Sequence, residues 1–426
     1  MSDGGATFAA GGERPVSRTD SRKEDPPSSL PMQCSAMVRC RKFSISIIAL
    51  LALVVIKIFI DLSSPPFEFS DPSSSISAEP SNSALIMLES LQDDEKATLA
   101  ALHSLAQNLK KMVPFAEAYW NMKQLQLLDL RRPWAWTCSR SMAWISPQEP
   151  YSDLLKTFLT QGNCRNHKMI INQPYKCPLN STFLLLAIKS SPQNFAQRQA
   201  VRETWGAEKS YDGKYVRLVF LLGTVPVLDL SPLLEYENNL SHDLLQWDFE
   251  DTFFNLTLKD QLFLGWARTY CTKAKYILKG DDDVFVRTAS IMRVLSSLSR
   301  YRHHSLYMGH VVKSAKPYRD PQSKYYIPTS YYMGMYPPYA GGGGYVFSGS
   351  LTPWLYLASH FVFPFPIDDV YTGMCFMVLG VKPIGHSGFK TFNTPKKSKS
   401  SNCVDKKFLL VHQKSPRPRD FEDVGG

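Results

Sequence analysis

The stretch Tyr276-Ile-Leu-Lys-Gly-Asp-Asp-Asp-Val-Phe-Val286 decides the fold of this chain. The apolar runs on both sides of its acids have the composition of short buried strands. Three adjacent carboxylates at the end of a core strand repel each other and are costly to bury. A divalent cation would remove both costs, and oxygen ligands that leave room for phosphate oxygens suit Mg²⁺ or Mn²⁺ carrying a nucleotide diphosphate. A solvated turn is the alternative, which the two flanking strands disfavour.

Strands and helices alternate on both sides of this stretch. We expect buried strands at 183–188, 216–222, 276–278 and 284–286, and helices at 193–206, 233–245, 255–271 and 368–379. This alternation predicts an α/β fold with a mostly parallel sheet. Such sheets bind ligands at the carboxyl ends of their strands, near a switch in strand order. The three aspartates follow one of these ends.

A second pair of acids, Asp368 and Asp369, opens an expected helix. The helix macrodipole stabilises carboxylates at this end whether or not they have a function. The same field keeps a carboxylate ionised, as a general base requires. Upstream, the glycines of Tyr336-Pro-Pro-Tyr-Ala-Gly-Gly-Gly-Gly-Tyr345 predict a loop that approaches a ligand closely or acts as a hinge. Its tyrosines have flat faces that suit sugar rings.

Length and composition bound the class of protein. The chain has 426 residues, of which 44% are hydrophobic, enough for one large domain or two ordinary ones with a sizeable core. The formal net charge is +10, but the basic residues are spread along the chain. No basic helix or aromatic RNA-binding signature occurs, so we expect no nucleic-acid partner.

One apolar segment, Phe43 to Leu62, has the length of a membrane span. Lys57 near its end can snorkel to the interface. Basic residues precede the segment and acids follow it, so the positive-inside rule places residues 1–42 in the cytosol. A cleaved signal peptide is the alternative, which the late start of the segment and the lack of a small-residue cleavage site disfavour.

The remaining organisation follows from this anchor. We expect residues 1–42 to form a disordered cytosolic tail, because they are rich in Gly, Ser, Pro and charge. Residues 63–114 form an expected stem with one amphipathic helix, which packs on its own domain or on a second copy. Residues 115–426 form the expected lumenal domain.

Cysteines and sequons agree with a lumenal location. The six cysteines that follow the anchor predict up to three disulfides in an oxidising compartment; they are Cys138, Cys164, Cys177, Cys271, Cys375 and Cys403. Three sequons, at Asn180, Asn239 and Asn255, are candidate N-glycosylation sites.

Several segments occur in the order typical of one enzyme family. They are Phe183-Leu-Leu-Leu-Ala-Ile-Lys-Ser190, Arg198-Gln-Ala-Val-Arg-Glu-Thr-Trp-Gly206, Lys279-Gly-Asp-Asp-Asp-Val-Phe-Val286, Tyr339-Ala-Gly-Gly-Gly-Gly344 and Asp368-Asp-Val-Tyr-Thr-Gly373. In combination they resemble the β-1,3-glycosyltransferase family over roughly residues 115 to 415. Further segments, such as Tyr336-Pro-Pro-Tyr-Ala340, look most like the poly-N-acetyllactosamine-extending N-acetylglucosaminyltransferases.

The resemblance implies a GT-A fold, a Rossmann-like nucleotide-sugar-binding domain, with a UDP-sugar donor, Mn²⁺ (or Mg²⁺) and inversion at the anomeric carbon. It implies that Asp369 is the catalytic base and that Asp283 and His412 bind the metal. The donor-binding residues that it implies are Lys189, Arg198, Arg202, Lys279, Gly280, Asp281 and Asp282. The acceptor or sugar loop that it implies contains Tyr339, Gly342, Gly343 and Asp368.

The expected protein is therefore a single-pass type II Golgi membrane enzyme. It would transfer N-acetylglucosamine from UDP-GlcNAc to O3 of a terminal galactose on glycoproteins or glycolipids. A β-1,3-galactosyltransferase that uses UDP-galactose is the first alternative, and a non-catalytic lumenal sugar-binding or partner protein is the second. A homodimer or a complex with other Golgi glycosyltransferases is compatible with this expectation. The acceptor class stays open among N-glycans, O-glycans, keratan sulfate and glycolipids.

Overall fold

The structure, a computed structural model, describes residues 107, 110, 113, 117–129, 151–161, 164–178, 182–299, 303–391 and 408–412. All of them belong to one compact unit that spans Ala78–Gly426. The expected tail (1–42), the expected anchor (43–62) and nearly all of the expected stem lie outside the described residues. Within the described ranges, no helix is long and apolar enough to cross a membrane.

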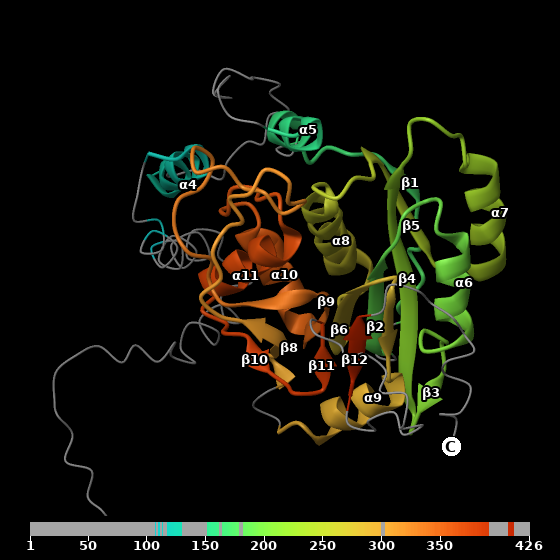
Figure 1. Cartoon of the computed structure of the whole chain (residues 1–426). Coiled ribbons are helices and arrows are strands. Elements are labelled where there is room, and N and C mark those ends of the chain that lie inside the picture. The colour runs from blue at the N-terminus through green and yellow to red at the C-terminus, as the bar shows by residue number, and fades with distance from the viewer. Residues whose placement is uncertain are drawn as a thin grey trace, which may run out of the picture. The chain divides into compact units, whose positions relative to one another are not determined.

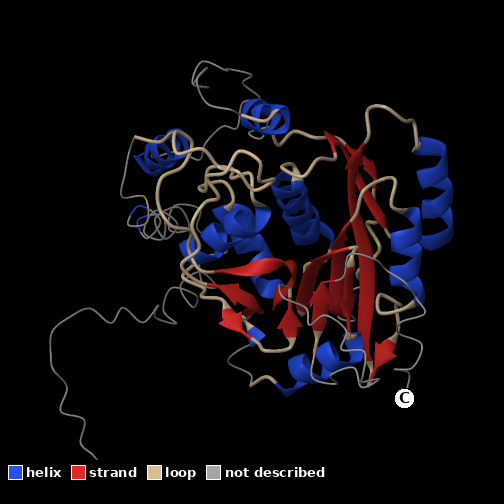
Figure 2. Cartoon of the chain, in the orientation of Figure 1, coloured by secondary structure: helices blue, strands red, loops and turns tan. Residues whose placement is uncertain are grey.

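A nine-stranded mixed sheet forms the centre of the described part of the chain (Figures 1 and 2). Its strands are β1 (Met169–Ile171), β2 (Thr182–Lys189), β3 (Ser210–Tyr211), β4 (Lys214–Thr224), β5 (Leu244–Glu250), β6 (Tyr276–Asp281), β8 (Tyr307–Val312), β9 (Tyr339–Ser348) and β10 (Ile384–Gly385). The spatial order is β1-β5-β4-β2-β6-β9-β8-β10, and β3 pairs with β4. The four central strands, β5, β4, β2 and β6, are parallel, as the sequence predicts, whereas β9 is antiparallel to both of its neighbours.

The chain reverses its direction of travel across the sheet at β2. After β2 it builds β4 and β5 on one side and then returns to place β6 on the other. Every residue of β2 is buried, because its apolar run faces helices on both sides. In the register of the β2–β6 pair, Lys189 lies opposite Asp281. The ends of two neighbouring parallel strands therefore meet at the switch point, where open α/β sheets bind ligands.

Helices cover both faces of the sheet. They are α6 (Phe195–Glu203), α7 (Ser231–Ser241), α8 (Leu256–Tyr270), α9 (Thr288–Ser297), α10 (Thr352–Ala358) and α11 (Asp368–Val378). Figure 1 shows α6 and α7 on one side of the central strands, and α8, α10 and α11 on the other.

Alternate residues of the strands supply the two cores between these layers. Leu184 and Leu186 of β2 belong to the apolar cluster that contains residues of α6, α7 and α9. Leu185 and Ala187 belong to the cluster that contains residues of α8, α10 and α11. Since each fully buried leucine contributes about 1.5–3 kcal/mol, the unbroken apolar run of β2 stabilises both layers at once.

Two expected elements differ in the structure. The helix expected at 233–245 ends at Ser241, where His242 takes a left-handed conformation with φ of 48°, and Leu244 begins β5. Leu240 of α7 and Leu244 of β5 are four residues apart, which is a helical spacing, so the apolar pattern does not mark the boundary. The glycine-rich segment expected as a loop is strand β9, because β6 and β8 pair with it from both sides.

A small second sheet brings the described C-terminal residues to the central sheet. It consists of β7 (Val284–Val286), β11 (Phe389–Lys390) and β12 (Leu410–His412). Strand β12 is antiparallel to β7, and His412 lies opposite Val284. A residue more than a hundred positions along the chain is thereby placed beside the aspartates.

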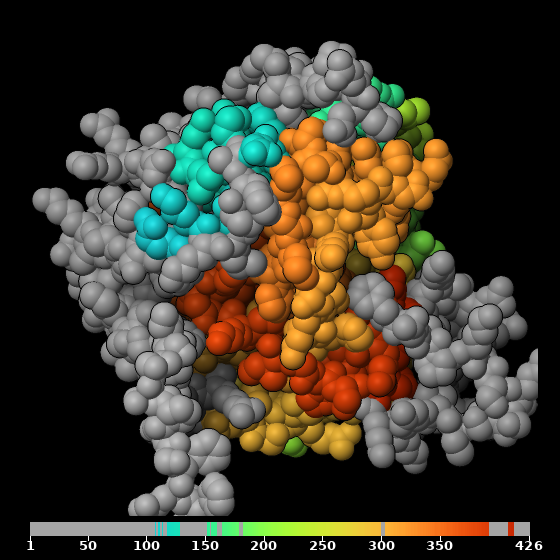
Figure 3. Space-filling model, turned by 60° about the vertical axis from the view of Figure 1, so that its left-hand side comes forward, coloured from blue at the N-terminus to red at the C-terminus, as the bar shows by residue number. Residues whose placement is uncertain are grey.

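The helices α4 (Tyr119–Asp129) and α5 (Asp153–Gln161) precede the sheet in the chain. The indole of Trp120 is buried and donates to the carbonyl oxygen of Phe363 at 3.0 Å. Gln124 donates to the carbonyl of Phe361 and accepts from the backbone N–H of Phe363, both at 2.8 Å. Backbone bonds also link Tyr119 to Ser330, and Figure 3 shows α4 (cyan) beside the orange segment that contains Ser330. Helix α4 therefore contacts both ends of the segment from residue 330 to residue 363.

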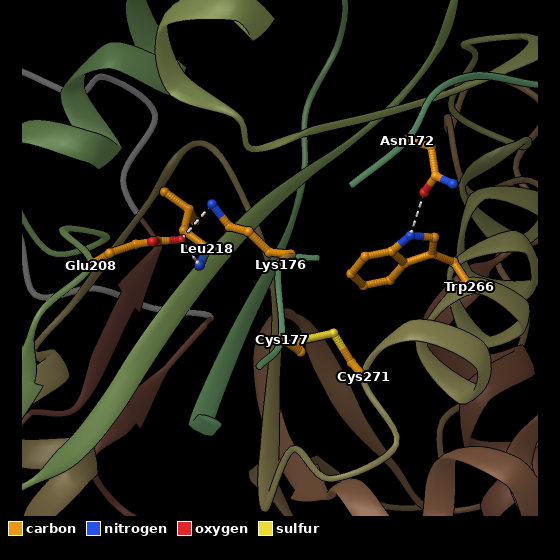
Figure 4. Close-up of a disulfide and its surroundings, with 7 residues drawn as sticks. All are labelled: Asn172, Lys176, Cys177, Glu208, Leu218, Trp266 and Cys271. Carbon is orange, nitrogen blue, oxygen red and sulfur yellow. Dashed lines mark hydrogen bonds and ion pairs between the residues drawn. A yellow bond between two sulfur atoms is a disulfide. The ribbon is translucent and has the colours of Figure 1, made fainter. Parts of the chain in front are cut away.

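One disulfide joins Cys177, which follows β1, to Cys271 at the end of α8 (Figure 4). Polar contacts flank it: Lys176 pairs with Glu208 at 2.6 Å, and Trp266 donates to Asn172 at 2.9 Å. Cys164 is also disulfide-bonded. Cys375 is a buried free thiol, which corrects its expected part in a disulfide, and burial raises its pKa to about 12. Cys138 and Cys403 lie outside the described residues.

Candidate active site

A cavity of about 1000 Å³ opens at the carboxyl ends of β2 and β6. Its volume is at the upper end of the range for small-molecule sites, about 300–1000 Å³. Acidic residues line one part of it, together with one lysine and one histidine: Lys189, Asp281, Asp282, Asp283, Asp368, Asp369 and His412. Residues from four segments of the chain therefore meet at the switch point of the sheet.

The three adjacent aspartates have different partners. Asp281, with 31% of its side chain exposed, pairs with Lys189 at 3.1 Å. Asp282 is buried, and one of its oxygens accepts hydrogen bonds from Ser190 at 2.6 Å and Asn194 at 2.9 Å. Asp283, the most exposed of the three, lies 3.1 Å from the Nε2 atom of His412. Asp282 is thus fixed to the protein, whereas Asp281 and Asp283 face the cavity.

Asp283 and His412 suit a cation. Among the described residues, no group of three or more His, Cys, Asp or Glu side chains is arranged to hold a metal ion by itself. The Oδ1 atom of Asp283 is nevertheless buried and accepts no hydrogen bond. The hydrogen bond that His412 donates to the Asp283 carboxylate raises the pKa of His412. An orphaned carboxylate oxygen beside an imidazole fits a site in which donor phosphates complete the metal shell, as Mg²⁺ sites commonly require.

Lys189 connects the two acidic segments. Its buried ammonium group forms ion pairs with Asp368 and with Asp281. Burial alone would lower the pKa of Lys189, but the negative charges of Asp281, Asp368 and Asp369 raise it well above its usual value. The same ammonium outweighs the effect of burial on Asp368 and lowers the pKa of that carboxyl. Lys189 and Asp368 therefore form a buried charged pair at the wall of the cavity.

Asp369 has the opposite electrostatic environment. Burial, followed by the charge of Asp368, raises the pKa of Asp369 well above that of an ordinary aspartate, although Lys189 opposes the shift. The nearby backbone N–H of Gly342 also opposes the shift. A Cβ atom at residue 342 would lie 2.5–2.8 Å from the carboxylate atoms of Asp369, so glycine is required there. The Oδ1 atom of Asp369 is buried and has no hydrogen-bond partner, so it is available to accept a proton.

Comparison with known proteins identifies the family of this chain. Residues 196–386 match the galactosyltransferase family. N-acetyllactosaminide beta-1,3-N-acetylglucosaminyltransferase 2 of Mus musculus is 48% identical over 269 residues, which are 62% of this chain and 68% of that protein. The human protein of the same name is 47% identical over the same shares. This chain belongs to the galactosyltransferase family.

Another relative matches a larger share of the chain. UDP-GlcNAc:betaGal beta-1,3-N-acetylglucosaminyltransferase 8 of Mus musculus is 36% identical over 397 residues, 89% of this chain and 96% of that protein. Among solved structures, a galactosyltransferase in complex with donor and acceptor sugar analogues covers 55% of this chain and 87% of its own at 12% identity and a TM-score of 0.31. That structural likeness is too distant to carry an argument.

Arg198 and Arg202 differ from the donor-binding role that the family resemblance implies. Neither belongs to the residues that line the cavity. Both donate to Glu237, and Arg202 also donates to Asp243 at 2.8 Å. The fully buried Arg198 donates to the Ser190 hydroxyl at 3.1 Å, which in turn donates to Asp282. The pair therefore holds the loop after β2 in place.

Lys279 and Gly280 are also corrected. The ammonium group of Lys279 is buried against Asp260 of α8 and lies 5.1 Å from the ring centroid of Phe263. Burial lowers the pKa of Lys279 well below its usual value. Gly280 pairs with Gly344 inside the sheet, and neither Lys279 nor Gly280 lines the large cavity. Lys279 lies two residues before Asp281, roughly 7 Å back along β6 from its carboxyl end, and its ammonium group contacts α8 there.

The expected sugar loop is at the cavity, although it is a strand. Tyr339, Gly342 and Gly343 of β9 line the cavity, together with Asp368. A Cβ atom at residue 343 would lie 3.0 Å from Thr391 and 3.5 Å from His412, so this glycine lets β9 pass close to the second sheet. Pairing of β9 on both sides leaves no loop to act as a hinge, and close approach of this strand to a ligand stays a prediction.

Sequence reasoning missed several residues of the site. Ser190 and Asn194, which hold Asp282, follow β2 directly, and polar residues in that position were a readable signal. The other part of the cavity is aromatic and basic, and its residues are Phe253, Lys316, Tyr318, Lys324, Tyr325 and Tyr336. These residues come from loops, for which the sequence has no periodic signal.

The sequons have different surroundings. Asn239 is exposed on α7, and its glycosylation stays a prediction. Asn255 is buried, and its side-chain nitrogen donates to the carbonyl of Glu250 at 2.8 Å. A glycan on that nitrogen would break the bond and would not fit, so the expected modification of Asn255 is corrected. Asn180 lies outside the described residues.

Proposed function

We propose that this protein transfers N-acetylglucosamine from UDP-GlcNAc in β-1,3 linkage to a terminal galactose, and thereby extends N-acetyllactosamine chains. The observation that carries the proposal is that Asp369, with a raised pKa, and the Asp281–Asp283 acids line one cavity. The relatives whose names specify this reaction support the choice of donor and acceptor.

In a GT-A-type domain, the residues of the cavity would each have a separate role in the transfer. Inverting transfer is one in-line displacement, which needs a base on the acceptor hydroxyl and no enzyme nucleophile. Asp369 accepts the proton of the galactose O3 as that oxygen attacks the anomeric carbon, and UDP leaves. A divalent cation, Mn²⁺ or Mg²⁺, held by Asp283 and His412 would neutralise the charge of the departing diphosphate. Asp368, fixed by Lys189, faces the same space and can accept a hydrogen bond from a sugar hydroxyl.

A β-1,3-galactosyltransferase is the second candidate. The match to a family described as galactosyltransferase favours it. Donor choice depends on one axial or equatorial hydroxyl and an N-acetyl group, which are contacts that a bound donor would reveal.

The place of action follows from the same reasoning. We propose a Golgi membrane enzyme of type II, anchored by residues 43–62, with residues 115–426 in the lumen. The disulfide between Cys177 and Cys271 supports an oxidising compartment. The substrates would be galactose-terminated glycans of glycoproteins or glycolipids, and a homodimer or a complex with other Golgi glycosyltransferases would fit this setting.

A transfer assay tests the proposal. The full-length protein in detergent, with Mn²⁺ and a galactose-terminated disaccharide, should use UDP-GlcNAc in preference to UDP-galactose and form a β-1,3 linkage. Preference for UDP-galactose would establish the second candidate. Failure to use either donor, while the protein remains folded, would leave a non-catalytic sugar-binding role.

Replacement of the base provides the matched control. Since general-base catalysis contributes about 10²- to 10⁴-fold, Asp369→Asn should lower kcat by that factor. Affinity for UDP, measured by calorimetry, should stay within about twofold, because the diphosphate is held elsewhere in the cavity. Unchanged turnover in the folded variant would exclude Asp369 as the base.

A further inference from the structure

The cavity extends beyond the acidic residues that the proposed reaction uses. Its second part is formed by loop residues after β5 and by the segment between β8 and β9. We call this part the aromatic end, and its residues are Phe253, Lys316, Tyr318, Lys324, Tyr325, Tyr336 and Tyr339. The proposed transfer uses none of these side chains, so they are free to determine which acceptor enters.

Rings at the aromatic end form a platform. Tyr325 lies with its ring centroid 6.0 Å from Tyr318 and 5.5 Å from Phe253. Tyr318 is 62% exposed, which is unusual for a large aromatic side chain. Exposed, clustered tyrosine faces are suited to stacking against the apolar face of a sugar ring.

Strand β9 runs from the proposed base to this platform. Gly342 contacts the Asp369 carboxylate, and Tyr339, three residues earlier on the same strand, lines the aromatic end. At about 3.3 Å per residue, the two positions are separated by roughly 10 Å. Because Asp369 and the aromatic residues line one continuous cavity, an acceptor whose galactose lies at Asp369 can place its next sugar at the aromatic end.

Positive charge accompanies the platform. The ammonium group of Lys324 lies 4.8 Å from the ring centroid of Tyr325 and 5.2 Å from that of Phe253, so cation–π contacts order it there. Lys316 lines the same end. The ion pairs of the described residues match Asp251 with Lys259, and Asp281 and Asp368 with Lys189, but contain no carboxylate partner for Lys316 or Lys324.

The segment around these lysines also carries a net positive charge. Between residues 313 and 338 the chain contains Lys313, Lys316, Arg319 and Lys324, and Asp320 as the one acid. The carboxylate of Asp320 accepts the backbone N–H of Gln322 at 2.9 Å. The aromatic end is therefore basic, in contrast to the acidic end where the donor would bind with its cation.

We propose that the aromatic end binds the sugar that precedes the acceptor galactose, and that Lys316 and Lys324 select acceptors in which this sugar carries an anionic group. The group would be a sulfate ester or a carboxylate, since both present oxygens to an ammonium group. This inference rests on the proposed transfer to a terminal galactose, and it adds the class of acceptor.

Three acceptors test the inference on the full-length protein. They are a neutral galactose-terminated disaccharide, the same disaccharide with a sulfate ester on its second sugar, and one with a carboxylate on that sugar. Because exposed charge pairs contribute little each, the wild type should favour an anionic acceptor by about 3- to 10-fold in kcat/KM at low salt, mainly through KM. The preference should decline as salt rises, since salt screens exposed charges.

Charge-removing variants separate the two lysines from general electrostatics. Lys316→Gln with Lys324→Gln should abolish the preference, so that the variant uses the neutral and the anionic acceptors with similar kcat/KM. Lys313→Gln removes an exposed charge of the same segment that does not line the cavity, and should keep the preference. Whichever anionic acceptor loses its advantage in the double variant identifies the group that is recognised.

The possible failures are distinguishable. Equal use of neutral and anionic acceptors by the wild type, or a preference that survives in the double variant, would overturn the inference and leave the proposed function intact. Transfer to none of the acceptors from either donor would overturn the proposed function, and the inference with it. Tyr318→Ala should slow transfer to the neutral and anionic acceptors alike, and unaltered rates on both would exclude the platform.

Discussion

At the scale of single residues, Asp368 and Asp369 show how surroundings shift the pKa values of two neighbouring carboxylates in opposite directions. Both lie in the first turn of α11, where the helix dipole favours negative charge. Lys189 pairs with Asp368 and lowers its pKa, and the resulting fixed charge then helps to raise the pKa of Asp369. One residue can therefore stay ionised while its neighbour remains basic enough to accept a proton.

The pH dependence of the reaction should report this coupling. A base acts only when ionised, so kcat/KM should fall as pH falls through the raised pKa of Asp369. In Asp368→Asn the like charge is removed and Lys189 remains, so the pKa of Asp369 should fall and the acidic limb should move to lower pH. The pH profile of kcat/KM measures this shift. A limb that stays in place or moves to higher pH would contradict the coupling.

Gly342 sets the contact between the strand and the base. In Gly342→Ala the added Cβ atom would clash with the carboxylate of Asp369 and displace it. We expect kcat to fall at least tenfold, since small displacements of a catalytic group are costly, while the affinity for UDP changes little. Rate measurements and calorimetry separate the two effects. In the background of Asp369→Asn the same alanine should cost less, and an equal cost in both backgrounds would show a purely structural role.

At the scale of elements, helix α4 connects chain segments that are distant in sequence. Its buried residues contact residues 330–333 and 361–363, which precede β9 and α11 respectively. Those two elements supply Gly342 and Asp369. The helix therefore stabilises the part of the fold that holds the base, although none of its own residues lines the cavity.

Removal of the central side chain of α4 tests this role. Trp120→Ala would leave a cavity where the indole packs against Tyr332 and Phe365, with ring centroids 5.3 Å and 5.7 Å away. Large-to-small core substitutions of this kind cost about 3–5 kcal/mol. Urea denaturation should show that loss in the free energy of unfolding. The exposed Met122 on the same helix provides a control, since Met122→Ala should cost less than about 1 kcal/mol.

At the scale of the whole molecule, the fold brings separate parts of the chain to one edge of a sheet. Residues near 189, 282, 369 and 412 line the same cavity because β2 and β6 are adjacent parallel strands, α11 packs on β9, and β12 pairs with β7. The disulfide between Cys177 and Cys271 closes a loop that contains β2, β4 and β5. It therefore constrains much of the parallel half of the sheet.

Loss of this disulfide should destabilise the molecule. The two cysteines are 94 residues apart, and cross-linking a loop of about 100 residues lowers the free energy of the folded state relative to the unfolded chain by roughly 4–5 kcal/mol. Cys177→Ser with Cys271→Ser should accordingly lower the midpoint of thermal unfolding by several degrees. Thermal unfolding followed by circular dichroism measures this. An unchanged midpoint would mean that native contacts, rather than chain entropy, hold this region.

The sequence by itself determined the class of fold, the central strands and the acidic residues of the site. Long apolar runs such as that of β2, and acids placed at strand and helix ends, are local patterns with local physical causes. Local patterns failed where contacts with distant residues decide the structure. Pairing with β6 and β8 makes the glycine-rich segment a strand. Ion pairs with Glu237 and Asp260 hold Arg198 and Lys279 away from the cavity. Only the tertiary structure assembled the aromatic end and matched each carboxylate with its partner, because contacts between residues distant in the chain follow from packing and not from spacing.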